Sequence, residues 1–475
     1  MTSAIVVGAG PNGLAAAVRL ASHGIDVEVL EAADAIGGGT RTSELTIPGV
    51  LHDHCSAFHP LGVGSPYLKK LKLERNGLQW RWPEIDCAHP LDSGQVGILW
   101  RSIEETASGL GADGDRWRSA FGAPSRSFDV VADDVLRSLI HVPAHPFRLA
   151  RFGLPALAPA TLFAKWWRGE VARALFGGVA AHAYHPLNQL GTSAVAMGII
   201  SAGHLHGWPV AEGGSRSITD ALAARLSELG GRISTGVTVT DSRELSNADV
   251  VLFDLAPRAV ARILGDKLSP RIARAYSRYR HGPGAFKVDF AIEGGVPWRN
   301  AECGRAGTVH LGGTFEETVA TERDIAAGRM PERPFVLVGQ QYLADPTRST
   351  GNVHPLWTYA HVPHGYSGDA TSAIIAQIER FAPGFRDRVV ATSVRSTADL
   401  EAANPNFVGG DILTGSNTLR QLLLRPRTSI DPYSTGVPGR FLCSAATPPG
   451  AGAHGMGGYH ASGSALRHLR VTPTD

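Results

Sequence analysis

The sequence predicts an α/β fold in which a discontinuous Rossmann-type domain carries an inserted α+β domain. Residues 4–7 form a short apolar run that leads into a glycine-rich turn, and residues 14–21 then repeat apolar side chains at helical spacing. A second apolar run follows Gly24, as expected for a strand–helix–strand unit of a parallel sheet. Alternating runs between residues 284 and 361 predict the strands of the inserted domain.

The turn after the first strand has three glycines with the spacing of a dinucleotide-binding loop: Gly8, Gly10 and Gly13. In a chain with 56 glycines this spacing alone carries little weight, and it recurs within residues 450–455. The context makes it informative, because a strand precedes it, a helix follows, and Glu31 ends the next strand. In such a unit the glycines allow the backbone to approach a pyrophosphate and the acid can bond a ribose hydroxyl. We therefore predict a dinucleotide site; an ordinary glycine-rich turn is the alternative.

Composition limits the classes of protein to which the chain can belong. With 43% hydrophobic residues across 475 positions it can bury a sizeable core, and its length favours two packed domains. A net charge of +2 gives no long-range attraction to nucleic acid. The four cysteines are far apart, which argues against a redox dithiol or a zinc site and fits a reducing compartment. No apolar run reaches the length of a membrane span and no room precedes the first strand for a secretory signal, so we expect a cytoplasmic protein, soluble or peripheral to a membrane.

The two domains are expected to interrupt one another along the chain. We assign residues 1–85, 205–283 and 405–475 to the dinucleotide-binding domain, and residues 86–204 and 284–404 to the substrate domain. One mixed domain is the alternative. Residues 139–169 are apolar, broken by prolines and rich in Arg, Phe and Trp, which predicts short helices and turns. They suit a mobile cover or a face resting on lipid, and packing against the rest of the protein is the equal alternative.

Periodicity predicts the remaining elements. Strands are expected at residues 233–240, 250–254, 284–292, 335–340, 355–361 and 440–446. Helices are expected from a capping box of Ser217 and Asp220 up to Gly230, at residues 370–381, and at residues 455–469.

Two further glycine-rich segments can contribute to the dinucleotide site. Within residues 36–41, Gly37 and Gly38 let a loop fold back over phosphates, and Thr40 or Arg41 can bond them. Residues 441–447 lead through a Pro/Gly turn into the start of the last helix. The chain ends too soon for a second strand with its acid, so this segment is expected to face an anion or a carbonyl rather than to form a second nucleotide fold.

Together these three segments resemble the phytoene desaturase-like branch of the flavin amine oxidase superfamily, and within it the bacterial relatives of pyridine nucleotide-disulphide oxidoreductase domain-containing protein 2. The resemblance extends in the same order through stretches that cover most of the chain: residues 48–66, 89–92, 207–239, 286–298 and 440–458. It implies an FAD-binding fold and leaves the substrate open.

The resemblance also implies which residues hold FAD. The first glycine turn takes the pyrophosphate, Glu31 the adenosine ribose, the second glycine loop covers the phosphates, and the backbone at Val239 meets the adenine. The loop at residues 54–58 and the start of the last helix border the isoalloxazine. Gly39 stands where carotenoid desaturases usually have Arg, and Ser444 and Ala445 stand where they have Gly-Asp, so the ribityl contact falls to Ser444 or backbone N–H groups. The expected cofactor-binding residues are Gly8, Gly10, Pro11, Asn12, Gly13, Glu31, Gly37, Gly38, Thr40, Arg41, Ser56, Ala57, Val239, Ser444, Ala445, Gly455 and Met456.

Lys287 is a candidate catalytic residue. In flavin amine oxidases a strand lysine about ten residues before a Trp holds a water at the flavin N5, and Lys287 precedes Trp298 by eleven residues. A buried lysine has a lowered pKa and can relay a proton. The alternative is a strand lysine that reaches a rim or pairs with Asp289.

Histidines are numerous, and two lie in segments expected to border the flavin. His59 and His454 are candidates for moving protons, and a purely structural role is the alternative for each. His52, His54 and His59 share one irregular loop that lacks supporting carboxylate spacing, so we expect no metal site there.

We expect an FAD-dependent oxidoreductase that dehydrogenates or desaturates an apolar small molecule by hydride transfer to flavin. The absence of a second nucleotide fingerprint and of a dithiol disfavours a disulphide-reductase mechanism. A flavin amine oxidase is one alternative, although residues 448–456 are mostly apolar and offer neither carboxylates nor an aromatic cage. A non-catalytic flavin-binding chaperone or assembly factor is the other.

Overall fold

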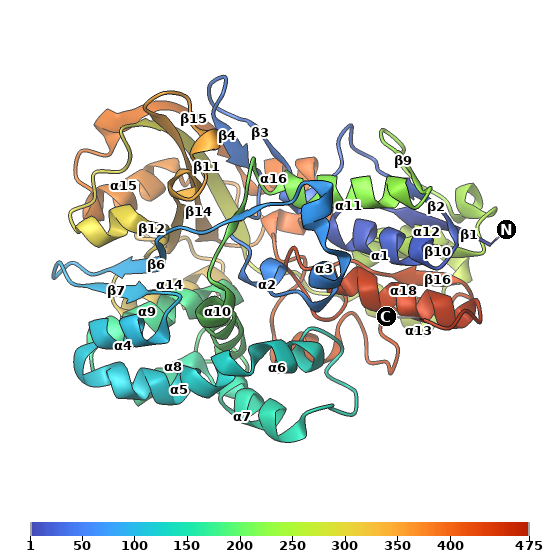
Figure 1. The fold of residues 1–475 in the computed structure, drawn as a ribbon, viewed down its shortest axis with the longest axis horizontal. Helices are drawn as coiled ribbons and strands as arrows, with labels where there is room; N and C mark the ends of the chain where they lie inside the picture. The colour runs from blue at the N-terminus through green and yellow to red at the C-terminus, as the bar shows by residue number, and fades with distance from the viewer. Residues whose placement is uncertain (1, 474–475) are drawn as a thin grey trace.

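The computed structural model describes residues 2–473, whose two large sheets lie at opposite ends of the longest axis (Figure 1). Two short antiparallel pairs, β3 (Thr42–Glu44) with β4 (Leu51–Asp53) and β5 (Trp80–Arg81) with β8 (Val210–Ala211), complete the sheets. The first sheet is parallel and has five strands in the order β16–β10–β1–β2–β9. Its strands are β1 (Ser3–Val7), β2 (Asp26–Leu30), β9 (Arg232–Ser234), β10 (Val250–Phe253) and β16 (Arg440–Leu442).

The second sheet is mixed and has seven strands in the order β15–β11–β14–β13–β12–β6–β7. Its strands β6 and β12 pair in parallel, and the other neighbours are antiparallel. The strands are β6 (Ile85–Pro90), β7 (Val96–Leu99), β11 (Gly284–Glu293), β12 (Ala306–Leu311), β13 (Val336–Gly339), β14 (Val353–Val362) and β15 (Val389–Arg395).

Helices cover both faces of the parallel sheet, which explains why its central strands β1 and β10 are mostly apolar. Val6 faces a core shared with the helices α1, α11 and α18, whereas Val7 faces a core shared with α12 and α13. These helices are α1 (Pro11–Ser22), α11 (Arg216–Glu228), α12 (Pro257–Leu264), α13 (Pro270–Ser277) and α18 (Met456–His468).

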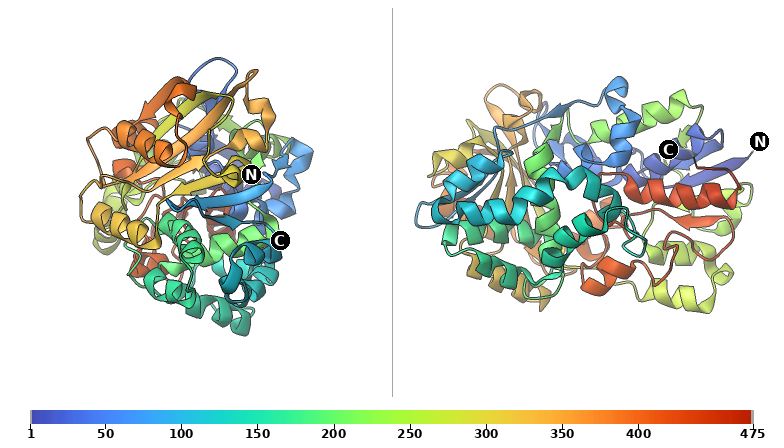
Figure 2. Two further views of the ribbon diagram at one scale, coloured as in Figure 1. Left: turned by 90° about the vertical axis from the view of Figure 1, so that its left-hand side faces the viewer. Right: turned by 60° about the horizontal axis from the view of Figure 1, so that its bottom comes forward.

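The mixed sheet is also largely buried on both faces. One face packs against helices, and the other contributes residues that line the site. Phe286, Val288 and Phe290 pack under α15 (Thr371–Phe381), while Ala285 on the alternate face joins Trp357 and Tyr359 of β14. A helical region between residues 103 and 206 lies alongside and continues toward the parallel sheet (Figure 2). Its main helices are α4 (Ile103–Gly109), α5 (Gly114–Arg126), α6 (Phe128–Val135), α7 (Pro146–Leu157), α9 (Glu170–Ala180) and α10 (Ser193–His206).

The predicted fold class is confirmed, because a parallel Rossmann sheet and a separate mixed sheet are both present. The predicted strands at 284–292, 335–340 and 355–361 and the predicted helices at 370–381 and 455–469 form, with bounds that differ by a few residues. Residues 139–169 form short helices, as predicted. All strands of the parallel sheet fall within the residues assigned to the dinucleotide domain, whereas the division into domains stays a prediction.

Three local predictions were wrong. The strand expected over residues 440–446 ends at Leu442, because the chain then turns and the N–H of Thr447 donates to the carbonyl of Ser444. The strand expected over residues 233–240 ends at Ser234, because the chain turns at Gly236, where φ is +70°. The capping box does not form, since the Ser217 hydroxyl donates to the carbonyl of Glu212 and Asp220 pairs with Arg216. In residues 2–473 no helix is both long and apolar enough to span a bilayer.

Candidate functional site

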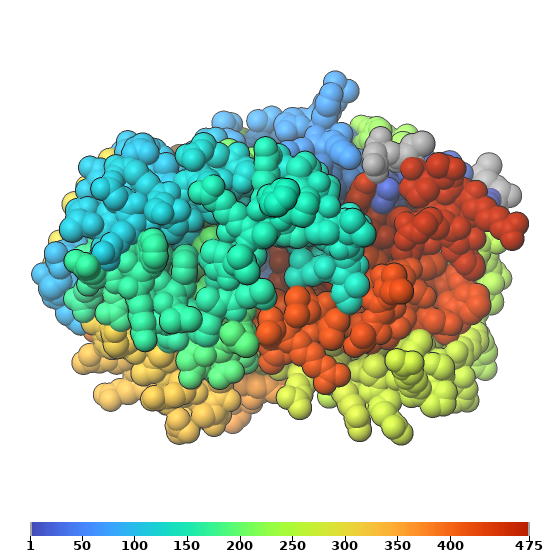
Figure 3. Space-filling model, turned by 90° about the horizontal axis from the view of Figure 1, so that it is seen from below, coloured from blue at the N-terminus to red at the C-terminus, as the bar shows by residue number. Residues whose placement is uncertain are grey.

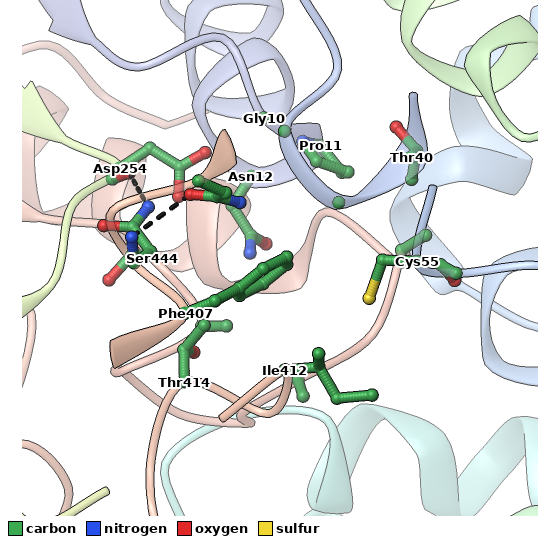
Figure 4. Close-up of a pocket in the computed structure, with 18 of the residues that line it drawn as sticks. Gly10, Pro11, Asn12, Thr40, Cys55, Asp254, Phe407, Ile412, Thr414 and Ser444 are labelled. Atoms are coloured by element: carbon green, nitrogen blue, oxygen red, sulfur yellow. Dashed lines mark hydrogen bonds between the residues drawn. The ribbon is translucent and has the colours of Figure 1, made fainter. Parts of the chain in front are cut away.

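A cavity of about 840 Å³ runs between the two sheets (Figure 4). Its nucleotide end lies at the carboxyl ends of β1, β2 and β10, where parallel sheets bind ligands. Its aromatic end lies against the mixed sheet and is lined by Phe58, His182, Ile199, Trp208, Thr308, Leu337, Trp357 and Tyr359. The cavity thus joins two regions: the polar nucleotide end, which we call the cradle, and the apolar aromatic end, which we call the chamber.

The first glycine turn places the amino terminus of α1 against the cavity. Gly8 adopts φ +104° and lines the cavity together with Gly10, Pro11 and Asn12. A Cβ atom on Gly13 would lie 2.1 Å from the carbonyl oxygen of Gly8, so this glycine permits the packing of helix on strand rather than lining the cavity. The cavity-lining turn and the helix dipole suit an anion such as a pyrophosphate.

Glu31 lines the nucleotide end and is held there by three groups. Its carboxylate accepts from the N–H of Ala9 at 2.7 Å and from that of Ala33 at 3.0 Å, and Arg41 lies 3.5 Å away. Each oxygen keeps a free lone pair, because a carboxylate has about four acceptor positions. The predicted bond to a ribose hydroxyl is therefore compatible with this geometry. Val239 lines the same end.

The second glycine loop crosses the cavity at residues 38–41. Gly37, which does not line it, and Gly38 have φ of +115° and +52°. The Thr40 hydroxyl donates to the carbonyl of Gly37 at 2.8 Å, so it is engaged within the loop. Arg41 donates to the carbonyl of Ala403 at 3.0 Å, and its buried Nε has no hydrogen-bond partner within residues 2–473. Arg41 is therefore better placed than Thr40 to bond a phosphate.

The carboxyl-terminal segment contributes differently from the prediction. Ser444 and Ala445 line the cavity, and the Ser444 hydroxyl donates to the carbonyl of Leu255 at 2.7 Å. Residues 451–453 line it as well, but Gly455 and Met456 do not. The Met456 side chain packs into the core of the helical region instead.

Ser56 and Ala57 line the cavity beside His59, whose ring is held by hydroxyl groups. The Ser215 hydroxyl donates to the carbonyl of Ser56 at 2.7 Å, so it can only accept from His59 Nε2, 2.9 Å away. Burial lowers the pKa of His59 to about 4, and the ring is neutral at neutral pH. Its Nδ1 is left as an acceptor.

His454 supports the start of the last helix instead of facing the cavity. Its Nδ1 accepts from the backbone N–H of Met456 at 3.1 Å and so caps the start of α18, and burial lowers the pKa of the ring to about 4. His454 does not line the cavity.

Lys287 projects from β11 on the face that carries the aromatic end. It forms a buried ion pair with Asp289, and its Nζ lies 5.8 Å from the ring centroid of Trp357. Burial lowers the pKa of Lys287, and the charge of Asp289 opposes that shift. The lysine lines a small void that shares Cys55, Trp357 and Tyr359 with the main cavity. The pairing with Asp289 that sequence analysis kept as the alternative is thus present.

Sequence reasoning missed several cavity residues. Asp254 follows β10 and accepts from the N–H of Gly13 at 3.0 Å, and a Cβ atom on Gly10 would lie 2.5 Å from its Oδ2. Burial raises the pKa of Asp254 to about 7. Residues 402–407 and 412–414 line the centre, with the ring of Phe407 projecting into it (Figure 4). An acid directly after a buried strand was the one available signal for Asp254, whereas residues 402–414 match no motif.

Comparisons with known proteins agree with this geometry. Residues 6–71 match the family model described as NAD(P)-binding Rossmann-like domain. The whole chain is distantly related to pyridine nucleotide-disulfide oxidoreductase domain-containing protein 2 of Mus musculus, with 24% identity over 98% of this chain and 94% of that protein.

Solved structures show the same fold along the full chain. An oxidoreductase from Methanosarcina mazei superimposes with a TM-score of 0.67 at 17% identity, covering 98% of this chain and 100% of that one. Putrescine oxidase bound to putrescine superimposes with a TM-score of 0.61 at 18% identity, covering 99% of both chains. The fold with its parallel Rossmann sheet and separate mixed sheet is therefore shared with an amine oxidase.

Proposed function

We propose that this protein is an FAD-dependent oxidoreductase that takes hydride from a largely apolar substrate. The observation that carries the proposal is one continuous cavity that joins the dinucleotide cradle to the aromatic face of the mixed sheet. A dinucleotide that enters at the Rossmann turn has its other half within reach of a substrate in the aromatic end. Relatives whose names include oxidoreductase or oxidase support the assignment.

The residues at the cradle fit FAD. The start of α1 and the unpartnered Nε of Arg41 would hold the pyrophosphate, and Glu31 would hold a ribose. Val239 would contact the adenine, and Ser444 with residues 451–453 would lie toward the flavin. When bound, FAD supplies two-electron chemistry. The chain's own residues exclude water, since the aromatic end is lined by Trp208, Trp357 and Tyr359, each at most 6% exposed.

An amine oxidase is the second candidate, favoured by the fold shared with putrescine oxidase and by the aromatic side chains of the chamber. A screen decides between the two. Protein reconstituted with FAD is mixed anaerobically with apolar alcohols, alkenes and primary amines, and bleaching of the flavin spectrum is recorded. Bleaching by amines alone would favour the second candidate. Failure of every class to reduce the flavin would favour a non-catalytic role.

The affinity for FAD is expected to fall as the pH rises through 7. Asp254 has a raised pKa of about 7, so it is protonated below this value and becomes an anion beside the phosphate cradle above it. Glu31 is the nearest charge that raises this pKa, and the N–H groups of Gly13 and Gly10 oppose the shift. By linkage the dissociation constant rises by up to about tenfold per pH unit between the pKa of Asp254 in the free protein and its higher pKa in the complex. Titration of apoprotein with FAD at pH 6 and pH 9 measures the effect.

The control for this experiment removes the titrating group. Asp254→Asn keeps an oxygen acceptor for Gly13 and should bind FAD with a flat pH profile, whereas Asp266→Asn, at an exposed position beyond α12, should behave as the unaltered protein. A pH profile that is the same with and without Asp254 would assign the dependence to another group.

We also propose that residues 138–168 rest on an anionic bilayer. No acid lies between Asp134 and Glu170, while arginines and a lysine are interspersed with exposed apolar side chains. Figure 3 shows this segment (turquoise) on the outside of the molecule. Within this segment the most exposed apolar side chains are Val142 at 92%, Phe147 at 90% and Leu154 at 73%.

Sedimentation with vesicles of phosphatidylglycerol and phosphatidylcholine tests this surface. The protein should pellet with them. Phe147→Ser/Leu154→Ser should reduce binding by about tenfold or more, because each of these side chains would contribute up to about 1.5–3 kcal/mol when it inserts into the bilayer. Val390→Ser, which alters an exposed valine on β15, is the matched control. Equal binding by all three proteins, or none, would contradict the proposal.

A further inference from the structure

His182 lies at the aromatic end of the cavity, in the turn Ala181–Ala183 that follows α9. Its Nδ1 is 3.1 Å from the carbonyl oxygen of Val179. A carbonyl oxygen only accepts, so Nδ1 carries the proton and Nε2 has a lone pair. Because the ring lines the cavity and its Nδ1 edge is turned to Val179, Nε2 is the nitrogen that a bound molecule can reach.

The groups around His182 keep its ring neutral. His310 of β12 is fully buried and has its ring centroid 5.0 Å from that of His182, and the Trp208 ring lies 6.3 Å from His182 and 6.1 Å from His310. Burial lowers the pKa of His182 to about 4, and the nearby His361, which is paired with Glu322, acts in the same direction. At neutral pH His182 is therefore a hydrogen-bond acceptor and not a cation.

The rest of the chamber has few polar groups, and two of them are the buried indole N–H groups of Trp208 and Trp357, which have no hydrogen-bond partner within residues 2–473. Thr308 is 2% exposed, and its hydroxyl has no hydrogen-bond partner within residues 2–473. The acids that line the cavity in the described chain, Glu31 and Asp254, both lie at the nucleotide end. Asp289 and Glu322 are buried behind the lining and are already paired with Lys287 and His361. A buried ammonium ion would lack a carboxylate partner here, and burying an unpaired charge is costly.

We infer that Nε2 of His182, together with the Thr308 hydroxyl, anchors the substrate through one uncharged O–H or N–H group on an otherwise apolar molecule. The inference rests on the proposed function, because it names the class of molecule that the oxidoreductase takes. An apolar body fills the chamber between Trp357 and Ile199, and the single donor fixes its orientation. The two anchors recognise a neutral alcohol or amide in preference to an ether or an ammonium ion.

Isothermal titration calorimetry with three matched probes tests the inference: cyclohexanol, methoxycyclohexane and the cyclohexylammonium ion. Holoprotein should bind the alcohol about tenfold or more tightly than the ether or the ion, because the ether leaves His182 without its donor. His182→Phe keeps an aromatic ring but removes the acceptor, so it should bind the alcohol and the ether equally. His182→Gln restores an acceptor and should recover most of the preference.

His185→Phe is the matched control, since His185 lies three residues away and does not line the cavity. Equal binding of alcohol and ether by the unaltered protein, an unchanged preference in His182→Phe, stronger binding of the ion, or no binding of the alcohol at its solubility limit would each overturn the inference. The heat signal does not depend on flavin. A preparation that lacks FAD therefore contradicts the proposed function, while the comparison of alcohol with ether still decides the role of His182.

Discussion

Protein that carries Gly10→Val is expected to be purified without FAD. The backbone at Gly10 has φ −74°, which any residue can adopt, so the loss does not come from backbone strain. A Cβ atom there would lie 2.5 Å from Oδ2 of Asp254, and the two valine methyl groups would occupy the edge of the cavity where α1 begins. Overpacking of about 3 kcal/mol weakens binding by more than about a hundredfold. Chromatography of heat-released extract measures the FAD content.

Two further variants separate the loss of FAD from a general packing defect. Gly10→Val/Asp254→Ala removes the carboxyl group that the valine would meet. The steric clash within the protein is then relieved, while the valine still blocks the approach of the phosphates. Gly153→Ala adds a methyl group in α7, where nothing lies within 4 Å of it, and should retain FAD. A double variant that regains full FAD would show that the Gly10 substitution acts through Asp254 alone.

Lys287→Met is expected to lower stability and to slow one flavin half-reaction. Methionine roughly matches the lysine stem, but it leaves the fully buried carboxylate of Asp289 without its ion pair. Removing one partner of a buried pair costs about 3–5 kcal/mol. Loss of a positioned proton relay costs about 10²–10⁴-fold in rate. Denaturant unfolding measures the first effect, and stopped-flow reduction and reoxidation of the flavin measure the second.

The double variant Lys287→Met/Asp289→Asn distinguishes the two roles of the lysine. It removes both charges, so the stability should recover in part, while a catalytic defect should remain. If the double variant regains normal rates in both half-reactions, Lys287 acts only as the partner of Asp289 and the catalytic assignment is wrong.

The dinucleotide cradle could be predicted because its signal is local. The strand, the glycine turn and the start of α1 lie within about twenty residues. The positive φ of Gly8 and the close approach of Gly13 to the Gly8 carbonyl oxygen both arise within that turn. The apolar face of β11 could also be predicted, since Phe286, Val288 and Phe290 follow the period of a strand.

The chamber could not be predicted, because its residues come together only through distant pairings. Residues 85–90 form β6, but Asp86, His89 and Pro90 do not fit the residue pattern of a buried strand. The partner of this strand, β12, begins more than two hundred positions later. Thr308 reaches the cavity only because β12 pairs with β6 and β13. His182 was one histidine among many, and the carbonyl that orients it belongs to a helix end that no sequence pattern marks.

The late position of β16 and α18 dictates when the site can exist during synthesis. β16 pairs with β10, α18 packs so closely on α1 that a Cβ atom on Gly458 would lie 1.9 Å from the carbonyl oxygen of Asn12, and residues 444, 445 and 451–453 complete the cavity. The Rossmann turn is translated first, yet the space it faces is closed only after residue 468 has left the ribosome. Chains that stall before that point leave the apolar faces of α1 and β10 open to chaperones and proteases.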